Sequence, residues 1–311
     1  MLGTMAKKTS SAPVGENPRR PCPCGSGKRW KACHGAGDDV IVTRPFAGLA
    51  AECDLVALRE LLPSATAPLP LTTPLEVPVT VTSVLPGASA ALVRPDGEIW
   101  LGSQVQTRSG DLSADLARAL AWARSSPPGT SLPVVGPSGG ELVRLQDLID
   151  PNAALDITVH SDFGWWLVPD DGEPTPEVAA TLERANKVVM PTEPVTAPGV
   201  RSAYWVDTGT KAHLRWVRPE PEDALLAALA RLQARGELGL GAESRYAGAF
   251  RAHGLLVPVW DLDRDMHPKE WTAPVAEFAV RLEKALAEDA PLTDAERRAR
   301  DALAGKQVTL R

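Results

Sequence analysis

The sequence is short of cysteine and of long apolar runs, and each absence excludes a class of protein. Four cysteines in 311 residues are too few for a disulfide-stapled secreted scaffold. No window approaches the roughly 18 uninterrupted apolar residues of a membrane span, and residues 1–20 lack the apolar segment of a signal peptide. We therefore expect a cytoplasmic protein with no membrane span, long enough for one large domain or two small ones. Met5 heads its own Ala-Lys-Lys run and is a second candidate start of translation.

Tyrosine and phenylalanine are also scarce, with two and four residues against nine tryptophans. Trp165, Trp166, Trp205 and Trp216 fall on segments that we expect to be strands. Because side chains alternate between the two faces of a strand, one of Trp165 and Trp166 should be exposed unless both faces are covered. An exposed Trp could belong to a partner-binding surface, whereas core packing explains most of the other tryptophans.

Acidic residues are nearly missing from the N-terminus. Residues 1–36 contain seven of the 33 Lys and Arg side chains but only Glu16 of the 39 acidic ones, a net charge of +6; the other 26 basic and 38 acidic side chains give the remainder a net charge of −12. A basic arm therefore precedes an acidic body. Such arms often bind nucleic acid, ribosomes or acidic protein surfaces, although a solvated tail has the same composition.

The cysteines that are present are unevenly distributed. Cys22, Cys24 and Cys33 lie within 12 residues, and crowding of this kind in a chain without disulfides favours metal binding. Cys53 stands apart, in a segment whose apolar residues repeat at helical spacing. We expect it to be a small buried hydrophobe and not a nucleophile.

The crowded stretch reads PCPCGSGKRWKACHG at residues 21–35, and its Gly27-Lys28 suggests a phosphate-binding loop. That loop requires G-x-x-x-x-G-K-[ST] between a strand and a helix. Here Cys22 stands at the first glycine position, Arg29 follows Lys28, and no apolar strand precedes the stretch. The nucleotide interpretation fails on all three points.

A metal site explains the same residues. Cys22, Cys24, Cys33 and His34 form C-x-C-x8-C-H, three thiolates and one imidazole, which suits one tetrahedral Zn²⁺. The glycines between them permit the turn that brings the two pairs together. Because all four positions are filled by protein, the zinc should be structural, and its binding should supply the folding free energy of this small segment, about 10–16 kcal/mol in comparable sites.

Residues 20–35 resemble the SEC-C motif, the zinc-binding segment at the C-terminus of the preprotein translocase ATPase SecA and a detached module in other bacterial proteins. The resemblance rests on Pro-Cys-Pro-Cys-Gly-Ser-Gly-Lys followed by an aromatic residue, Lys, Cys and His, and it implies the same four zinc ligands. The SecA copy docks onto the chaperone SecB and contributes to ribosome and acidic-lipid contacts. Residues 40–311 show no Walker motif, so translocase activity is not implied. The whole chain also resembles a group of high-GC bacterial proteins of unknown activity.

Composition divides the chain into a disordered basic tail at 1–18, a zinc knuckle at 19–36, a linker at 37–45, an α+β domain at 46–290 and a C-terminal helix and tail at 291–311. A division of the domain into two lobes near 191–199 stays open. Strands mostly arrive as hairpins, which favours an α+β body with mainly antiparallel hairpins. We expect helices at 46–62, 113–124, 222–235, 244–252, 274–289 and 293–304, and one that starts at Thr175-Pro176. We expect strands at 79–85, 89–94 with 98–102, 155–160 with 163–169, 203–208 with 212–217, and 254–260.

The body contains two weak catalytic or metal patterns. Gly136-Pro-Ser-Gly-Gly140 is similar to the loop around a protease serine, but no histidine has a matching context. Asp261, Asp263 and Asp265 alternate as at the start of a calcium loop, but Met266 stands where glycine is needed. We expect ordinary loops at both places, with His267 shaping a turn.

The leading functional hypothesis is a zinc-binding, non-enzymatic adaptor or recruitment protein. Its knuckle would contact an acidic protein, chaperone or ribosomal partner through Lys28, Arg29, Trp30 and Lys31; nucleic acid is a weaker candidate partner. The alternative is a small-molecule enzyme, or a degenerate one, at residues 46–290, with the knuckle used only for recruitment. A pocket where carboxylate, histidine and arginine side chains converge would favour the enzyme.

Overall fold

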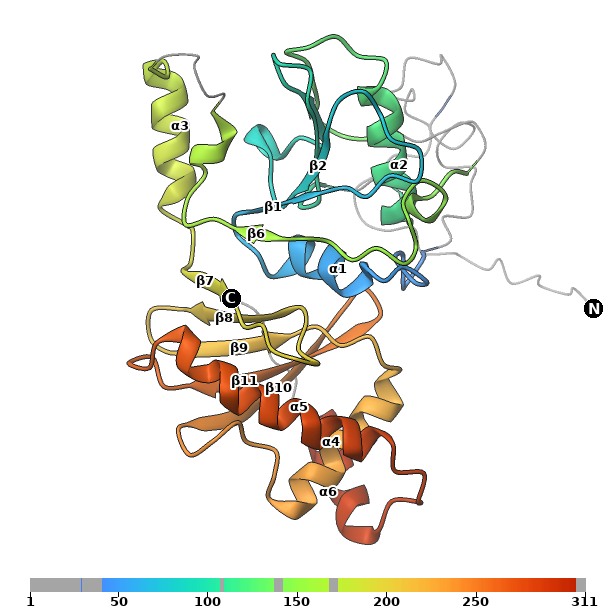
Figure 1. Ribbon diagram of the computed structural model, residues 1–311, viewed down its shortest axis with the longest axis vertical. Coiled ribbons are helices and arrows are strands. Elements are labelled where there is room, and N and C mark those ends of the chain that lie inside the picture. Colours follow the sequence, from blue (N-terminus) through green and yellow to red (C-terminus); the bar gives the residue numbers. More distant parts are fainter. Residues whose placement is uncertain (1–28, 30–40, 107–108, 137–141, 168–172, 306–311) are drawn as a thin grey trace, which may run out of the picture.

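The structure, a computed structural model, describes residue 29 and residues 41–106, 109–136, 142–167 and 173–305. These residues form helices and two sheets (Figure 1), which confirms the predicted α+β class with largely antiparallel strands. The helices are α1 (Glu52–Glu60), α2 (Leu112–Ala123), α3 (Pro176–Asn186), α4 (Glu222–Arg235), α5 (Thr272–Leu286) and α6 (Asp294–Ala304). Of the helices in the described ranges, none combines the length and apolar content that crossing a bilayer requires.

The first sheet, called here the N-terminal sheet, has the order β5-β3-β4-β2-β1-β6. Its strands are β1 (Ala65–Pro68), β2 (Val79–Thr82), β3 (Ala91–Val93), β4 (Ile99–Gly102), β5 (Ser131–Leu132) and β6 (Thr158–Val159). All pairs are antiparallel except β2 with β4. The predicted 89–94/98–102 hairpin is confirmed as β3–β4. Helix α2 packs on this sheet through Leu116, Ala119 and Leu120, which are buried in its core.

The second sheet, the C-terminal sheet, is antiparallel throughout with the order β10-β11-β9-β8-β7. Its strands are β7 (Thr192–Pro194), β8 (Ala203–Asp207), β9 (Ala212–Trp216), β10 (Ser244–Ala252) and β11 (Leu255–Leu262). One face packs on α4, α5 and α6, and Trp216, Trp260 and Phe278 are fully buried there. Helix α4 ends where Gly236 takes a left-handed conformation (φ 74°), and a capping box of Thr293 and Glu296 starts α6.

Helix α1 lies between the two sheets (Figure 1). Its apolar residues share one continuous core with the N-terminal sheet and with residues on the other face of the C-terminal sheet, among them Tyr204, Val217 and Val257. We call α1 and the residues that it contacts the junction. The expected lobe boundary at 191–199 contains β7, the first strand of the C-terminal sheet; the division into lobes stays a prediction.

The predicted helix at 244–252 is wrong, because this segment is strand β10. Its alanines and arginines suit a helix locally, but it pairs with β11 along its whole length. A β-bulge between Tyr246 and Gly248 shifts the register and keeps Tyr246 against Trp260, with ring centroids 5.5 Å apart. Tertiary pairing therefore overrides helix propensity here.

The predicted helix at 46–62 begins only at Glu52. Gly48 has a φ of +88°, a left-handed conformation that helical residues do not adopt, and residues 45–48 form a turn before the helix. The helix predicted at 113–124 is confirmed as α2, which begins at Leu112 with Asp111 as its N-cap. The helices at 175, 222–235, 274–289 and 293–304 are confirmed, with α5 shifted by about one turn.

The predicted strand at 163–169 is also wrong over the residues that the structure describes. Residues Gly164–Trp166 form a 3₁₀ helix, because Asp162 and Asn186 side chains accept hydrogen bonds from the Gly164 and Phe163 amides at 2.7 and 2.8 Å. Strand alternation therefore does not apply to the two tryptophans. Both are half-buried, and their indole N–H groups donate to Ser64 Oγ (2.8 Å) and the Val84 carbonyl (3.1 Å).

Candidate functional site

Most of the predicted site residues lie outside the described residues. These are the metal candidates Cys22, Cys24, Cys33 and His34 and the partner candidates Lys28, Trp30 and Lys31. Arg29 is described, and it is exposed. Within the described part of the chain, no group of three or more His, Cys, Asp or Glu side chains could hold a metal ion.

Cys53 lies on α1 and is half-buried. Burial, with a smaller contribution from the neighbouring carboxylates of Glu52 and Asp54, raises the pKa of its thiol to about 12. The thiolate is the nucleophilic form, so this thiol is unreactive at neutral pH. The prediction that Cys53 packs as a small hydrophobe and does not act as a nucleophile agrees with this environment.

Each of the four histidines of the body has a polar contact within the protein. His160 Nε2 lies 2.9 Å from Thr66 Oγ1, and burial lowers the pKa of the imidazole. His213 and His253 lie 3.2 and 2.7 Å from carboxylate oxygens of Asp261 and Glu60. His267 accepts a hydrogen bond from the Lys269 amide and caps a 3₁₀ turn, as predicted. Among the described residues, no carboxylate hydrogen-bonds to His160, so the Thr66–His160 pair lacks the orienting group of a catalytic triad.

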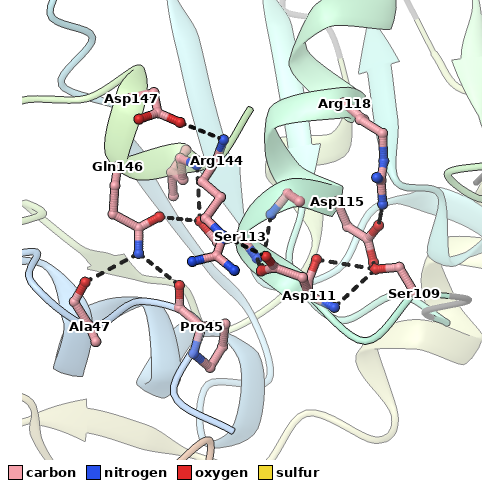
Figure 2. Close-up of polar contacts among 12 residues, drawn as sticks. Pro45, Ala47, Ser109, Asp111, Ser113, Asp115, Arg118, Arg144, Gln146 and Asp147 are labelled. Carbon is pink, nitrogen blue, oxygen red and sulfur yellow. Dashed lines mark hydrogen bonds and ion pairs between the residues drawn. The ribbon is translucent and has the colours of Figure 1, made fainter. Parts of the chain in front are cut away.

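A polar network surrounds the start of α2 (Figure 2). The Asp111 carboxylate accepts hydrogen bonds from the Ser113 amide (3.1 Å) and from Arg144 Nε (2.7 Å). The Ser113 hydroxyl donates to Gln146 Oε1 and accepts from the Leu145 amide at 2.9 Å. The Gln146 amide in turn donates to the Pro45 carbonyl at 2.8 Å.

This network has a structural role and not a catalytic one. The Ser113 hydroxyl donates to the Gln146 amide oxygen, which cannot act as a general base, and it accepts from the Leu145 amide. The network instead ties α2 to the turn before α1 and to residues 144–147. The Gly136-Pro-Ser-Gly-Gly140 loop lies outside the described residues except for Gly136, and Asp261 is held by Lys211 and Arg245, both at 2.9 Å.

Two clefts lie at the junction. The first, the Asp54 cleft, has a volume of about 460 Å³ and is lined by residues of α1, β7, β8 and the segment 154–157. Asp54 is 3% exposed and accepts hydrogen bonds from Arg201 Nη2 (2.7 Å), Ser202 Oγ (2.6 Å) and the Leu155 amide (3.1 Å). The hydrogen bond to Asp54 raises the pKa of Arg201. The Asp54 carboxylate and the Arg201 guanidinium are therefore matched with each other.

The second, the Arg215 cleft, has a volume of about 380 Å³ and lies between the end of α1, residues 188–190 and β9. Arg215 of β9 is its cation, and Glu60 its anion. Glu60 is bound to His253 at 2.7 Å, and this hydrogen bond is the main cause that lowers the pKa of Glu60. Neither Asp54 nor Arg215 was among the residues singled out from the sequence.

A family model described as a family of unknown function (DUF5926) matches residues 45–311. The chain belongs to the DUF5926 family. A model of the SEC-C motif matches residues 21–36, which confirms that resemblance. No curated protein and no solved structure matches the chain.

The two matches divide the candidate residues between them. Both sheets, the junction and both clefts belong to the DUF5926 region. The SEC-C region contains all four candidate ligands, Cys22, Cys24, Cys33 and His34, together with the basic residues between them. The DUF5926 description assigns no activity to the body.

Proposed function

We propose that the protein is a zinc-binding, non-enzymatic adaptor or recruitment protein whose N-terminal knuckle contacts an acidic protein or ribosomal partner. The observation that carries this proposal is the SEC-C match at residues 21–36, since that motif is of a zinc-binding type. The donor set fits the metal: three thiols and one imidazole are soft or borderline ligands, and four of them complete a tetrahedral Zn²⁺ shell. Bound there, zinc would stabilise the fold of the knuckle and leave no open position for catalysis.

The charge distribution supports recruitment by the knuckle. Lys28, Arg29 and Lys31 lie between the ligands, within an arm of net charge +6, and Arg29 is exposed. A basic rim held in shape by zinc would attract an acidic surface, with Trp30 as an apolar anchor. A cytoplasmic location, a high-GC bacterial origin and the division into tail (1–18), knuckle (19–36), linker (37–45), body (46–290) and C-terminal segment (291–311) are parts of the same proposal.

Metal analysis tests the zinc site. We expect the purified full chain to hold about one zinc per molecule, and Cys22→Ser to lower that value severely because one of four ligands is lost. Cys53→Ser is the matched control, since Cys53 is a thiol in α1 and not in the knuckle, and it should retain the zinc. Zinc content well below one per chain in the unaltered protein, or unchanged in Cys22→Ser, contradicts the proposal.

Comparative pull-downs test recruitment. The full chain and a chain that lacks residues 1–37 are used as baits, with a full-length variant in which Lys28, Arg29 and Lys31 are replaced by Gln as the charge control. We expect both altered baits to lose an acidic protein or ribosomal partner. If neither loses any partner, the knuckle does not recruit.

The enzyme alternative is favoured by one observation, the Arg215 cleft, where the Glu60 carboxylate, bound to His253, and a guanidinium line one cavity. A small molecule that the full chain returns chemically altered, and that Glu60→Gln returns unaltered, would establish this alternative. Release of every bound compound unchanged would favour a binding function for the body.

A further inference from the structure

Arg215 is placed on an internal face by strand alternation. On β9, Leu214 and Trp216 point into the core beneath α4 and α5, while Val217 belongs to the core shared with α1. Arg215 therefore belongs to the face of the C-terminal sheet that the junction covers. Only 5% of the residue is exposed.

The Arg215 side chain is without a partner among the described residues. Its Nε is buried with no hydrogen-bond acceptor, and none of the ion pairs within the described ranges includes it. Burial alone lowers its pKa, with no carboxylate acting against that effect. Of its three guanidinium nitrogens, only Nε is both buried and without an acceptor, so the group has lost part of its water without gaining a counter-charge, which is costly.

Three other arginines of the body are as deeply buried, and each has acceptors. Arg94 pairs with Asp96 and Glu98, Arg218 with Glu220 and Glu283, and Arg231 with Glu288 and the Ala285 and Ala290 carbonyls. Their exposures are 4%, 5% and 7%. Of these four buried arginines in the described residues, Arg215 alone has no acceptor.

The cleft beside Arg215 has room for a ligand. Its volume of about 380 Å³ is within the range of small-molecule sites, about 300–1,000 Å³. The polar groups other than Arg215 are engaged: Glu60 binds His253, and the Gln104 amide donates to the Leu58 and Leu62 carbonyls at 2.9 and 2.6 Å. The remaining wall is apolar: Leu61, Leu62, Pro63, Val84, Phe163, Val188, Val189 and Met190.

This lining selects among anions. One guanidinium matches one carboxylate in a bidentate pair, whereas a polyphosphate would need more than one cation and would be repelled by Glu60. Val188 in the apolar wall is 75% exposed to water. Because covering such apolar surface is favourable, the wall favours a ligand that also carries an apolar body. We propose that the Arg215 cleft binds a small organic monocarboxylate, with its carboxylate on Arg215 and its apolar body against residues 188–190 and the end of α1. This proposal is independent of the zinc knuckle.

Calorimetric titration of the full chain tests the proposal with three probes of graded chemistry. Octanoate has both the charge and the apolar body, octanamide has the body alone, and acetate has the charge alone. We expect octanoate to bind saturably at one site, about tenfold or more tighter than either of the others, because a hydrogen-bonded charge pair and apolar burial each contribute at least that much. Inorganic phosphate should bind more weakly than octanoate.

Two kinds of variant locate the site. Arg215→Met should lose octanoate binding by about tenfold or more, while Arg251→Met, which alters an exposed arginine on β10 of the same sheet, should not change it. Val188→Glu adds a negative charge at the rim and should weaken octanoate binding, and Val188→Gln, of the same size and neutral, should weaken it less. Since Val188 is exposed, this second pair stays informative even if Arg215→Met fails to fold.

Several results would overturn the assignment. Octanoate that shows no saturable binding, or that binds Arg215→Met as tightly as the unaltered chain, rules out Arg215 as the anchor. Equal effects of Val188→Glu and Val188→Gln place the ligand elsewhere. Acetate or inorganic phosphate binding as tightly as octanoate excludes the role given to the apolar wall.

Discussion

The two clefts at the junction are similar in volume and opposite in electrostatics. In the Asp54 cleft, the arginine is half-exposed and its guanidinium is bound to a buried carboxylate. In the Arg215 cleft, the arginine is buried and its guanidinium has no acceptor among the described residues. Arg201 lies just before β8, the neighbour of β9 in the C-terminal sheet, and Arg215 is the direct cross-strand partner of Tyr204, which lines the Asp54 cleft.

The difference teaches that volume alone does not mark a binding site. The Asp54 cleft is the larger of the two, about 460 against 380 Å³, yet its Asp54 carboxylate is already bound to Arg201, Ser202 and the Leu155 amide, contacts that tie α1 to the segments before β6 and β8. The Arg215 cleft retains an uncompensated cation, which a ligand would neutralise. The polar contacts of the Asp54 cleft therefore stabilise the junction, whereas the Arg215 cleft is the candidate site for a ligand.

Asp54→Ala should give the largest effect. It leaves the Ser202 hydroxyl, the Leu155 amide and Arg201 without their acceptor at a buried position, so we expect the free energy of unfolding to fall by about 3 kcal/mol. Urea denaturation measures this change. Arg201→Met should cost less, since half of its side chain is in water; an equal cost would contradict the leading role given to the buried carboxylate.

Arg215→Met should have the opposite sign. It removes an ionised group that is buried without a partner and replaces it with an apolar side chain of similar length, so we expect the free energy of unfolding to rise by about 1 kcal/mol. Arg231→Met is the matched control, because Arg231 is equally buried but has acceptors, and it should destabilise. Urea denaturation of both variants, without ligand, would contradict the comparison if Arg215→Met also destabilised.

The pH dependence of stability should show the smallest effect. The folded-state pKa of Glu60 is lowered from 4.5, mainly by its hydrogen bond with His253. Its contribution to stability is therefore fully present above pH 4.5 and is lost as pH falls through the lowered pKa. Since Glu60 is more than a third exposed, we expect about 0.5 kcal/mol or less.

Glu60→Gln provides the measurement of this effect. The variant should lose less stability than the unaltered chain when urea denaturation is repeated between about pH 6 and about pH 3. Identical pH profiles for the two chains would show that the Glu60–His253 contact contributes nothing to the junction.

Local signals explain which elements could be predicted from the sequence. Helix α4 has apolar residues at helical spacing and ends at Gly236, and α6 starts with a capping box, so both are specified by neighbours along the chain. Strand β10 could not be predicted in this way, because what holds it is pairing with β11 and packing of Tyr246 on Trp260. The 3₁₀ turn at Trp165-Trp166 depends likewise on Asn186, which is distant in sequence.

The candidate sites also differ in whether neighbours along the chain or tertiary packing specifies them. The four predicted zinc ligands are close in sequence, so their spacing alone predicts a metal site. Arg215 alternates with Leu214 and Trp216 as in any strand with one polar face, and that pattern predicts exposure to water. Only the covering of this face by the junction buries Arg215, and nothing adjacent to it in the sequence indicates such a cover. Asp54 similarly resembles a residue on the solvent face of α1.

Strand β10 is the longest strand in the described ranges and is an edge strand of the C-terminal sheet. One of its sides therefore has no neighbouring strand in that sheet. Unpaired edges of this length are places where protein chains join and aggregate. The bulge at Tyr246 and Gly248 interrupts the regular spacing of amides and carbonyls, and Arg245 and Arg251 on this strand are held in ion pairs with Asp261 and Glu222. A second copy of this strand would therefore meet a bent template, which disfavours strand pairing between copies.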